Sequence, residues 1–146
     1  MTLTVEKKRR YTLGKNERLK KRKAIEELFA SGESFAVHPF RVYFLKKKIE
    51  DCIAINGRLL PAESVLQAGV GVSKRNFKKA VDRNKIKRIT REAYRLQRTE
   101  LEELIIAKKE WCLKLFFIYN GTEKPDYRLV REKVRSALSR LHEKFK

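Results

Sequence analysis

The segment from Val72 to Arg98 constrains the fold of this chain more than any other stretch, and it reads VSKRNFKKAVDRNKIKRITREAYRLQR. Beyond about Lys78, apolar residues recur at the three- and four-residue spacing of one helix face. These residues are Ile86, Ile89, Ala93 and Leu96. Basic and amide side chains occupy the opposite arc, namely Arg83, Asn84, Lys87, Arg88, Arg91, Arg95 and Arg98. The pattern predicts an amphipathic helix with one face on a protein core.

The charge of this segment is almost all positive. Between Lys74 and Arg98 there are eleven Lys or Arg residues and two acids, Asp82 and Glu92. Helices that merely face solvent usually mix the two signs, because opposite charges four residues apart stabilise a helix and like charges destabilise it. A surface that only keeps the protein in solution is the alternative interpretation. The long face of a single sign favours a polyanionic partner.

A nine-residue motif within this helix carries a family resemblance. Residues 83–91 read RNKIKRITR and fit the pattern R-N-x-x-K-R-x-x-R, which closely resembles the signature of the bacterial ribonuclease P protein subunit. The similarity continues through GVGVSKR at 69–75 and EAYR at 92–95. Three further places match the family: RLKK at 18–21, Phe29 and the strand that contains Tyr43. The resemblance spans most of the chain, from about Arg18 to Leu141.

The resemblance implies both a fold and a function. The fold would be an α/β (α+β) two-layer sandwich in the order αβββαβα, with a mixed four-stranded sheet, similar to that of some ribosomal proteins. Its βαβ unit would have a left-handed crossover, whereas chirality rules alone favour a right-handed one. The function would be that of the protein subunit of ribonuclease P, an endoribonuclease that removes the 5′ leader from precursor transfer RNA. In that family, catalysis and its Mg²⁺ ions belong to an RNA subunit.

The resemblance also implies two sets of RNA-binding residues. The first would contact the catalytic RNA and comprises Lys74, Arg75, Arg83, Asn84, Lys87, Arg88, Arg91 and Arg95. Arginine suits phosphate because its planar guanidinium donates two parallel hydrogen bonds. The second would line a cleft for the single-stranded leader of precursor transfer RNA and comprises Phe29, Arg41 and Tyr43. We expect no protein partner to be required and no metal-binding residue in the chain.

Composition agrees with a nucleic-acid partner. The 146 residues suffice for one domain with its own core, and the formal net charge is +19. Such a charge predicts attraction to nucleic acid or to an anionic membrane. No run approaches the roughly 20 apolar residues of a membrane span, and the basic N-terminus lacks the apolar segment of a signal peptide. Cys52 and Cys112 have no metal or redox spacing, so we expect ordinary thiols in a reducing cytoplasm.

The chain divides into a mobile basic arm at 1–16 and a single RNA-binding α/β domain at 17–146. Residues 1–23 hold ten Lys or Arg and two acids, with few apolar residues, which is typical of a flexible segment. A helix is predicted at 22–31, where Ile25, Leu28 and Phe29 share one apolar face. Gly32 suits a left-handed cap at its end.

Strands are expected at 34–37 and 40–46, with His38-Pro39 between them because proline lacks a donor for the ladder. In the second strand Phe40, Val42 and Phe44 share one face, and Arg41, Tyr43 and Leu45 share the other. The latter face is either a half-buried surface without a special role or a platform on which single-stranded nucleotides stack.

Residues 47–64 are a predicted loop, or alternatively a hairpin extension around Asn56-Gly57, of unknown role. Residues 65–73 are a predicted strand. Two glycines on one face of that strand, Gly69 and Gly71, allow close approach to the backbone, either by a packed helix, which we expect, or by a ligand. Residues 99–109 either continue the basic helix or form a second short helix. The almost apolar strand predicted at 112–119 indicates coverage on both faces. Asp126 suits the N-cap of a last helix. Its core stripe is Val130, Val134, Leu138, Leu141 and Phe145.

A self-contained nuclease site is not expected. The two histidines, His38 and His142, lie in different predicted elements, and the acids are scattered without a metal-binding motif. Two other classes stay open beside the ribonuclease P subunit: a ribosome-associated structural protein, and a stand-alone ribonuclease or DNA-binding module. The identity of the RNA that copurifies with the chain would discriminate among them.

Overall fold

One four-stranded sheet underlies residues 18–48, 65–108 and 110–146, which are the part of the chain that the structure, a computed structural model, describes. The strands are β1 (Glu33–Val37), β2 (Phe40–Lys48), β3 (Leu66–Val72) and β4 (Trp111–Tyr119). The helices are α1 (Arg22–Ser31), α2 (Ala80–Gln97), α3 (Thr99–Lys108) and α4 (Tyr127–Phe145). The predicted arm at 1–16, Cys52 and residues 49–64 of the predicted loop lie outside the described residues.

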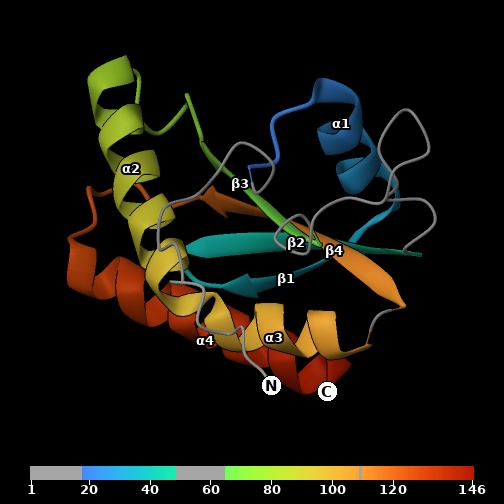
Figure 1. Ribbon diagram of the computed structural model, residues 1–146. Coiled ribbons are helices and arrows are strands. Elements are labelled where there is room, and N and C mark those ends of the chain that lie inside the picture. The colour runs from blue at the N-terminus through green and yellow to red at the C-terminus, as the bar shows by residue number, and fades with distance from the viewer. Residues whose placement is uncertain (1–17, 49–64, 109) are drawn as a thin grey trace.

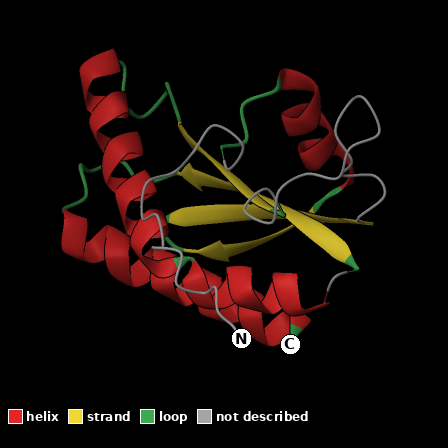
Figure 2. Cartoon of the chain, viewed as in Figure 1, coloured by secondary structure: helices red, strands yellow, loops and turns green. Residues whose placement is uncertain are grey.

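The strand order is β1-β2-β4-β3 (Figure 2). β2 pairs antiparallel with β1 and with β4, whereas β3 pairs parallel with β4. Because α2 and α3 connect the parallel pair, the predicted βαβ unit is present and the mixed sheet is confirmed. The order αβββαβα is also confirmed, with two successive helices in the crossover. Its handedness stays a prediction. Lys47 and Lys48 continue β2, where the sequence predicted a loop.

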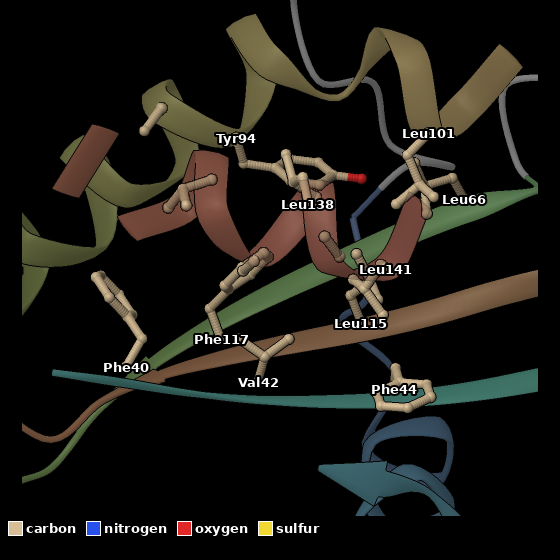
Figure 3. Close-up of a cluster of buried hydrophobic side chains, with 14 of the residues drawn as sticks. Phe40, Val42, Phe44, Leu66, Tyr94, Leu101, Leu115, Phe117, Leu138 and Leu141 are labelled. Atoms are coloured by element: carbon tan, nitrogen blue, oxygen red, sulfur yellow. The ribbon is translucent and has the colours of Figure 1, made fainter. Parts of the chain in front are cut away.

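The core lies between one face of the sheet and the helices α2, α3 and α4, while α1 lies on the other face (Figure 1). Strand alternation directs Phe40, Val42 and Phe44 into this core, as predicted. Figure 3 shows Leu138 and Leu141 of α4 facing the sheet. Removing each large apolar side chain from water contributes about 1.5 to 3 kcal/mol.

The buried face of α2 is rotated relative to the predicted stripe. Ile86 and Ala93 are buried, but Leu96 is 46% exposed. Thr90 and Tyr94 are buried instead, and the Thr90 hydroxyl donates to the Ile86 carbonyl at 2.8 Å, which satisfies the polar group inside the core. The prediction was wrong for Leu96, and it was wrong for Arg98, which is buried at the α2–α3 junction rather than on the basic arc.

Gly32 ends α1 in an extended conformation, with φ −84° and ψ 173°, so the predicted left-handed cap is wrong. The requirement for glycine is steric. A Cβ at this position would lie 2.5 Å from the Leu28 carbonyl oxygen and 2.7 Å from that of Phe44. Glycine therefore lets the chain turn tightly from α1 into β1 beside β2.

The predicted cap of α4 is confirmed, since the Asp126 carboxylate accepts a hydrogen bond from the Leu129 N–H at 2.9 Å. Val130, Val134, Leu138 and Leu141 are buried as predicted. Cys112 is buried and disulfide-bonded, which corrects the expected free thiol. In the ranges that the structure covers, no helix combines the length and the apolar character needed to span a bilayer.

Candidate nucleic-acid interface

The α2 basic face comprises Arg83, Asn84, Lys87, Arg88, Arg91 and Arg95, and none of the six is buried. Asn84, Arg88 and Arg91 are exposed. Among the described residues, no acid forms an ion pair with Lys87, Arg88 or Arg91. The helix thus presents free cations of one sign, as its sequence predicts.

Arg95 differs from the rest of the α2 basic face because it is paired within the helix. Its Nε donates to Glu92 Oε1 at 3.1 Å, and its Nη2 bonds to Glu92 Oε2. This hydrogen bond raises the pKa of Arg95 and lowers the pKa of Glu92. The carboxylate offsets much of the local charge, so Arg95 offers less free charge than Arg88.

Arg18, which precedes α1, lies near the α2 basic face. Partial burial lowers the pKa of Arg91, and the nearby charge of Arg18 lowers it further. The position of Arg18 is fixed by its neighbour, because the Leu19 N–H donates to the Ala68 carbonyl of β3 at 3.0 Å and Leu19 is buried. Arg18 therefore extends the α2 basic face across the edge strand β3.

Arg83 is directed toward the start of its own helix. Its Nη1 donates to the carbonyls of Phe77 and Lys78, both at 2.8 Å. These carbonyls belong to the basic loop, residues 73–79, which also carries the predicted contacts Lys74 and Arg75 on exposed positions. The guanidinium that the sequence assigned to RNA is thus already bonded to the protein backbone.

The open sheet face is the side of the sheet that α1 partly covers. The register places Arg41, Ile118 and Gly71 in one row and Tyr43, Phe116 and Gly69 in the next. The Phe29 ring of α1 stands edge-on to two rings of this face, 4.8 Å from Tyr43 and 5.2 Å from Phe116 between centroids. Phe29 is 42% exposed, and the other two rings are partly exposed. The result is a three-ring cluster within reach of solvent.

Arg41 supplies a cation next to this cluster. It is exposed, and its Nη2 donates to Ser34 Oγ at 3.1 Å. The structure therefore brings the three residues predicted for the leader, Phe29, Arg41 and Tyr43, onto one face. A hollow of about 460 Å³ lies elsewhere, near Gly32 and Phe145, and it includes none of the three.

The two glycines of β3 make room for a ring of the neighbouring strand. A Cβ on Gly69 would lie 2.7 Å from the Phe116 ring, and a Cβ on Gly71 would lie 2.9 Å from it. The expected approach of a helix is wrong, because the closest side chain is Phe116 of β4. The glycines thereby let an aromatic ring lie over the backbone of β3.

Sequence reasoning missed Phe116 and Lys114, which it placed inside a strand covered on both faces. Both are only partly buried, on the α1 side of β4. Lys114 Nζ donates to Gln67 Oε1 at 2.9 Å, and burial together with the charge of Lys47 lowers its pKa. The lysine within the apolar run was the available signal, since side chains alternate between the two faces of a strand and a charged one marks the face that is not core.

Within the described ranges, no three His, Cys, Asp or Glu residues lie close enough together to hold a metal ion. Asp and Glu side chains near the α2 basic face are engaged with cations, as Glu92 is with Arg95 and Asp82 with Lys124 at 3.1 Å.

A family model and two relatives of known name point to the same family. The family model described as Ribonuclease P matches residues 13–142. The ribonuclease P protein component of Porphyromonas gingivalis strain W83 is 32% identical over 131 residues, which cover 90% of this chain and 87% of the relative. That of Chlorobium phaeobacteroides is 33% identical over 129 residues, covering 84% and 83%.

Solved structures agree on the fold. The Staphylococcus aureus RNase P protein superposes with a TM-score of 0.59 at 19% identity, covering 89% of this chain and 98% of that one. A mutant of the same protein, described as having defective mRNA degradation activity, gives a TM-score of 0.61 at 20% identity, covering 87% and 89%. Ribonuclease P is the endoribonuclease that processes the 5′ ends of transfer RNA. By fold and sequence together, this chain belongs to the ribonuclease P protein component family.

Proposed function

We propose that this chain binds the RNA subunit of ribonuclease P through the α2 basic face and the 5′ leader of precursor transfer RNA through the open sheet face. The observation that carries the proposal is the presence of two chemically different surfaces on opposite sides of one sheet. One is the α2 basic face, where Lys87, Arg88 and Arg91 have no acid partner among the described residues, and the other is a cluster of partly exposed rings beside Arg41.

The α2 basic face suits the phosphates of a folded RNA. Each Lys or Arg that neutralises a phosphate releases condensed counterions, which makes binding favourable and dependent on salt. Arg88 and Arg91 have exposed side chains, so their guanidinium forks are available for bidentate contacts. Arg18, near Arg91, would lengthen the contact along the β3 edge.

The open sheet face suits a single strand. Stacking of a base on an aromatic side chain contributes about 1 to 3 kcal/mol and needs bases that are not already paired. Tyr43 and Phe116 lie in the sheet, where their backbone is held by neighbouring strands, and Phe29 packs edge-on against both. Such rings are preorganised, so little conformational entropy is lost when a base stacks on them.

In this proposal the chemistry belongs to the RNA subunit and its Mg²⁺ ions, and the protein supplies positive charge. Two polyanions, the RNA subunit and the precursor, repel each other, and bound cations reduce that repulsion. The protein should therefore lower the magnesium concentration that the RNA subunit requires. The reaction takes place in the cytoplasm, without a membrane and without a further protein partner.

Photo-crosslinking of the reconstituted holoenzyme tests the assignment of the two surfaces. A precursor with 4-thiouridine in its leader should crosslink to peptides that contain Tyr43 or Phe116. An RNA subunit labelled in the same way should crosslink to α2. A precursor labelled only in its mature part is the matched control and should leave the open sheet face unlabelled. If the leader instead crosslinked to α2, or the RNA subunit to the sheet, the assignment would be wrong.

A further inference from the structure

The basic loop, residues 73–79, concentrates positive charge between β3 and α2. Lys74, Arg75, Lys78 and Lys79 are all exposed. Four cations within six residues repel one another, and a loop of this kind would be expected to spread out in solution. The loop nevertheless has a defined conformation, and the contacts of three residues, Phe77, Asn76 and Arg83, account for it.

Two of these contacts come from the loop itself. Phe77 is buried, its ring lies 6.0 Å from the Tyr119 ring, and its N–H donates to the Ser73 carbonyl at 3.1 Å. Asn76 Nδ2 donates to the carbonyls of Asn120 at 3.1 Å and Gly121 at 3.2 Å. The loop is therefore fastened to the turn that follows β4.

The third contact comes from Arg83, one turn into α2. A single nitrogen, Nη1, donates to both the Phe77 and the Lys78 carbonyl at 2.8 Å. Lys79 is the N-cap residue of α2, and its side chain makes no capping hydrogen bond. Arg83 thus does not cap the free N–H groups of the first turn, since it is itself a donor, but it holds two backbone carbonyls immediately before the helix.

We propose that Arg83 and Asn76 are positioning residues, which hold the basic loop so that its four cations meet RNA phosphates together. In this proposal Arg83 acts by ordering the loop and does not itself bind a phosphate. This inference rests on the proposed function, in which the basic loop and α2 bind the RNA subunit. A positioning residue and a contact residue differ in the effect of their substitution. Removing Arg83 disturbs the phosphate contacts of several loop cations at once, whereas removing a contact residue such as Arg88 disturbs one.

Hydrogen exchange in the free protein tests the positioning role without RNA. Arg83→Gln should make the amides of residues 74–79 exchange several-fold faster, and Arg88→Gln, the matched control, should leave them unchanged. Asn76→Ala removes the other anchor and should give the same local effect if Arg83→Gln fails to fold. Unchanged exchange of the loop in both Arg83→Gln and Asn76→Ala would overturn the inference.

The salt dependence of RNA-subunit binding supplies the second test. Arg88→Gln should reduce the slope of log affinity against log salt by roughly 0.7 to 0.9, the share of one phosphate. Arg83→Gln should reduce it by more than this amount. In a background with all four loop cations changed to Gln, Arg83→Gln should have little further effect, because nothing is left to position. An undiminished loss in that background would show that Arg83 contacts RNA directly and would overturn the inference.

The two failures can be told apart. If neither Arg88→Gln nor the loop substitutions changed RNA binding, the proposed function of this surface would fail. The exchange measurement on the free protein would still decide whether Arg83 and Asn76 order the loop.

Discussion

The ring of Phe29 on α1 stands edge-on to the ring of Tyr43 on β2, with centroids 4.8 Å apart and planes at 82°. Edge-to-face pairs of this kind contribute about 0.5 to 1.5 kcal/mol beyond the burial of area. Phe29 nevertheless leaves 42% of its surface exposed, so part of the ring is accessible to a ligand. The pair is therefore a contact between α1 and the sheet, and in the proposed function it is also the surface on which a base stacks.

Replacing Tyr43 with alanine should weaken binding of precursors that carry a leader and spare mature transfer RNA. The expected loss is about 1 to 3 kcal/mol, the value of one stacked base. Phe29→Ala should act in the same direction, with an added loss of stability because α1 loses its contact with Tyr43 and Phe116. Equilibrium binding of the reconstituted holoenzyme to both ligands measures the difference.

The matched control for Tyr43→Ala is Tyr127→Ala. Tyr127 is also partly exposed, at 36%, but it lies on α4, on the opposite side of the sheet. This control should bind both ligands as the unmodified protein does. Equal losses for precursor and mature transfer RNA in Tyr43→Ala would mean that the aromatic cluster serves only the fold.

Gly71→Ala should destabilise the protein and disturb the aromatic cluster together. The new Cβ would lie 2.9 Å from the Phe116 ring, so the ring or the strand must shift. Insertion of a methyl group into a packed site typically costs about 1 to 3 kcal/mol. Urea unfolding measures the loss, and leader-dependent binding should fall with it.

Shortening the ring partner should rescue this variant. In a Phe116→Leu background the added Cβ has no ring to meet, so the Gly71→Ala substitution should cost much less stability than in the unmodified protein. A penalty of the same size in both backgrounds would show that the glycine is needed for its backbone and not for the ring.

The parts of the fold that depend on neighbouring residues alone could be predicted from the sequence. The N-cap at Asp126 needs only the next turn of α4, and alternation in β2 needs only a sheet with one buried face. The α2 stripe failed at Leu96 because a polar residue, Thr90, could enter the core by bonding to the Ile86 carbonyl. Hydrophobic spacing does not register such an internal hydrogen bond.

The site was harder to predict where it depends on contacts between distant segments. Phe116 and Gly71 are far apart in the sequence, and only the register of β3 against β4 brings the ring over the glycine. The pairing of Arg83 with the loop carbonyls was also invisible, because the sequence shows a charge but not what it bonds to. At Gly32, too, one of the two carbonyls that a Cβ would meet belongs to a distant residue, Phe44 of β2, and the other to Leu28 of α1.

Arg88 and Arg95 should differ in their contribution to RNA binding although both lie on the α2 basic face. Arg88→Gln should lower the salt slope of affinity by roughly 0.7 to 0.9. Arg95→Gln should lower it less, because Glu92 already pairs with Arg95. Binding of the RNA subunit across a potassium series measures both slopes, and circular dichroism should show folded protein in each case.

Ile86→Asp supplies the contrast for these surface variants. Ile86 is 2% exposed, so the substitution buries an unpaired charge and should unfold the domain.

Equal slopes for Arg88→Gln and Arg95→Gln would show that the pair with Glu92 opens on RNA binding and does not limit Arg95.

Lys114 should make stability depend on pH in the alkaline range. Burial lowers its pKa below the usual 10.5, the charges of Lys47 and Lys21 lower it further, and Glu27 raises it. The folded protein therefore binds this proton less tightly than the unfolded chain does. Folding is penalised while the lysine is charged, and the penalty is relieved as the pH rises through the folded pKa toward the unfolded value.

Lys114→Met removes the titrating amine, so this position no longer contributes to the pH dependence of the free energy of unfolding. Relative to the unmodified protein, the Met variant should be most favoured near neutral pH and should lose that advantage as the pH approaches about 10.5, the usual lysine value. The lost hydrogen bond to Gln67 Oε1 shifts the whole difference but changes its slope little, because a neutral amine donates there too. Glu27→Gln should steepen the slope, since it removes the neighbouring charge that raises the pKa of Lys114. Urea unfolding of the variants from neutral to alkaline pH measures these slopes. A difference between Lys114→Met and the unmodified protein that stayed constant, or grew with pH, would mean that Lys114 reaches water freely at the edge of α1.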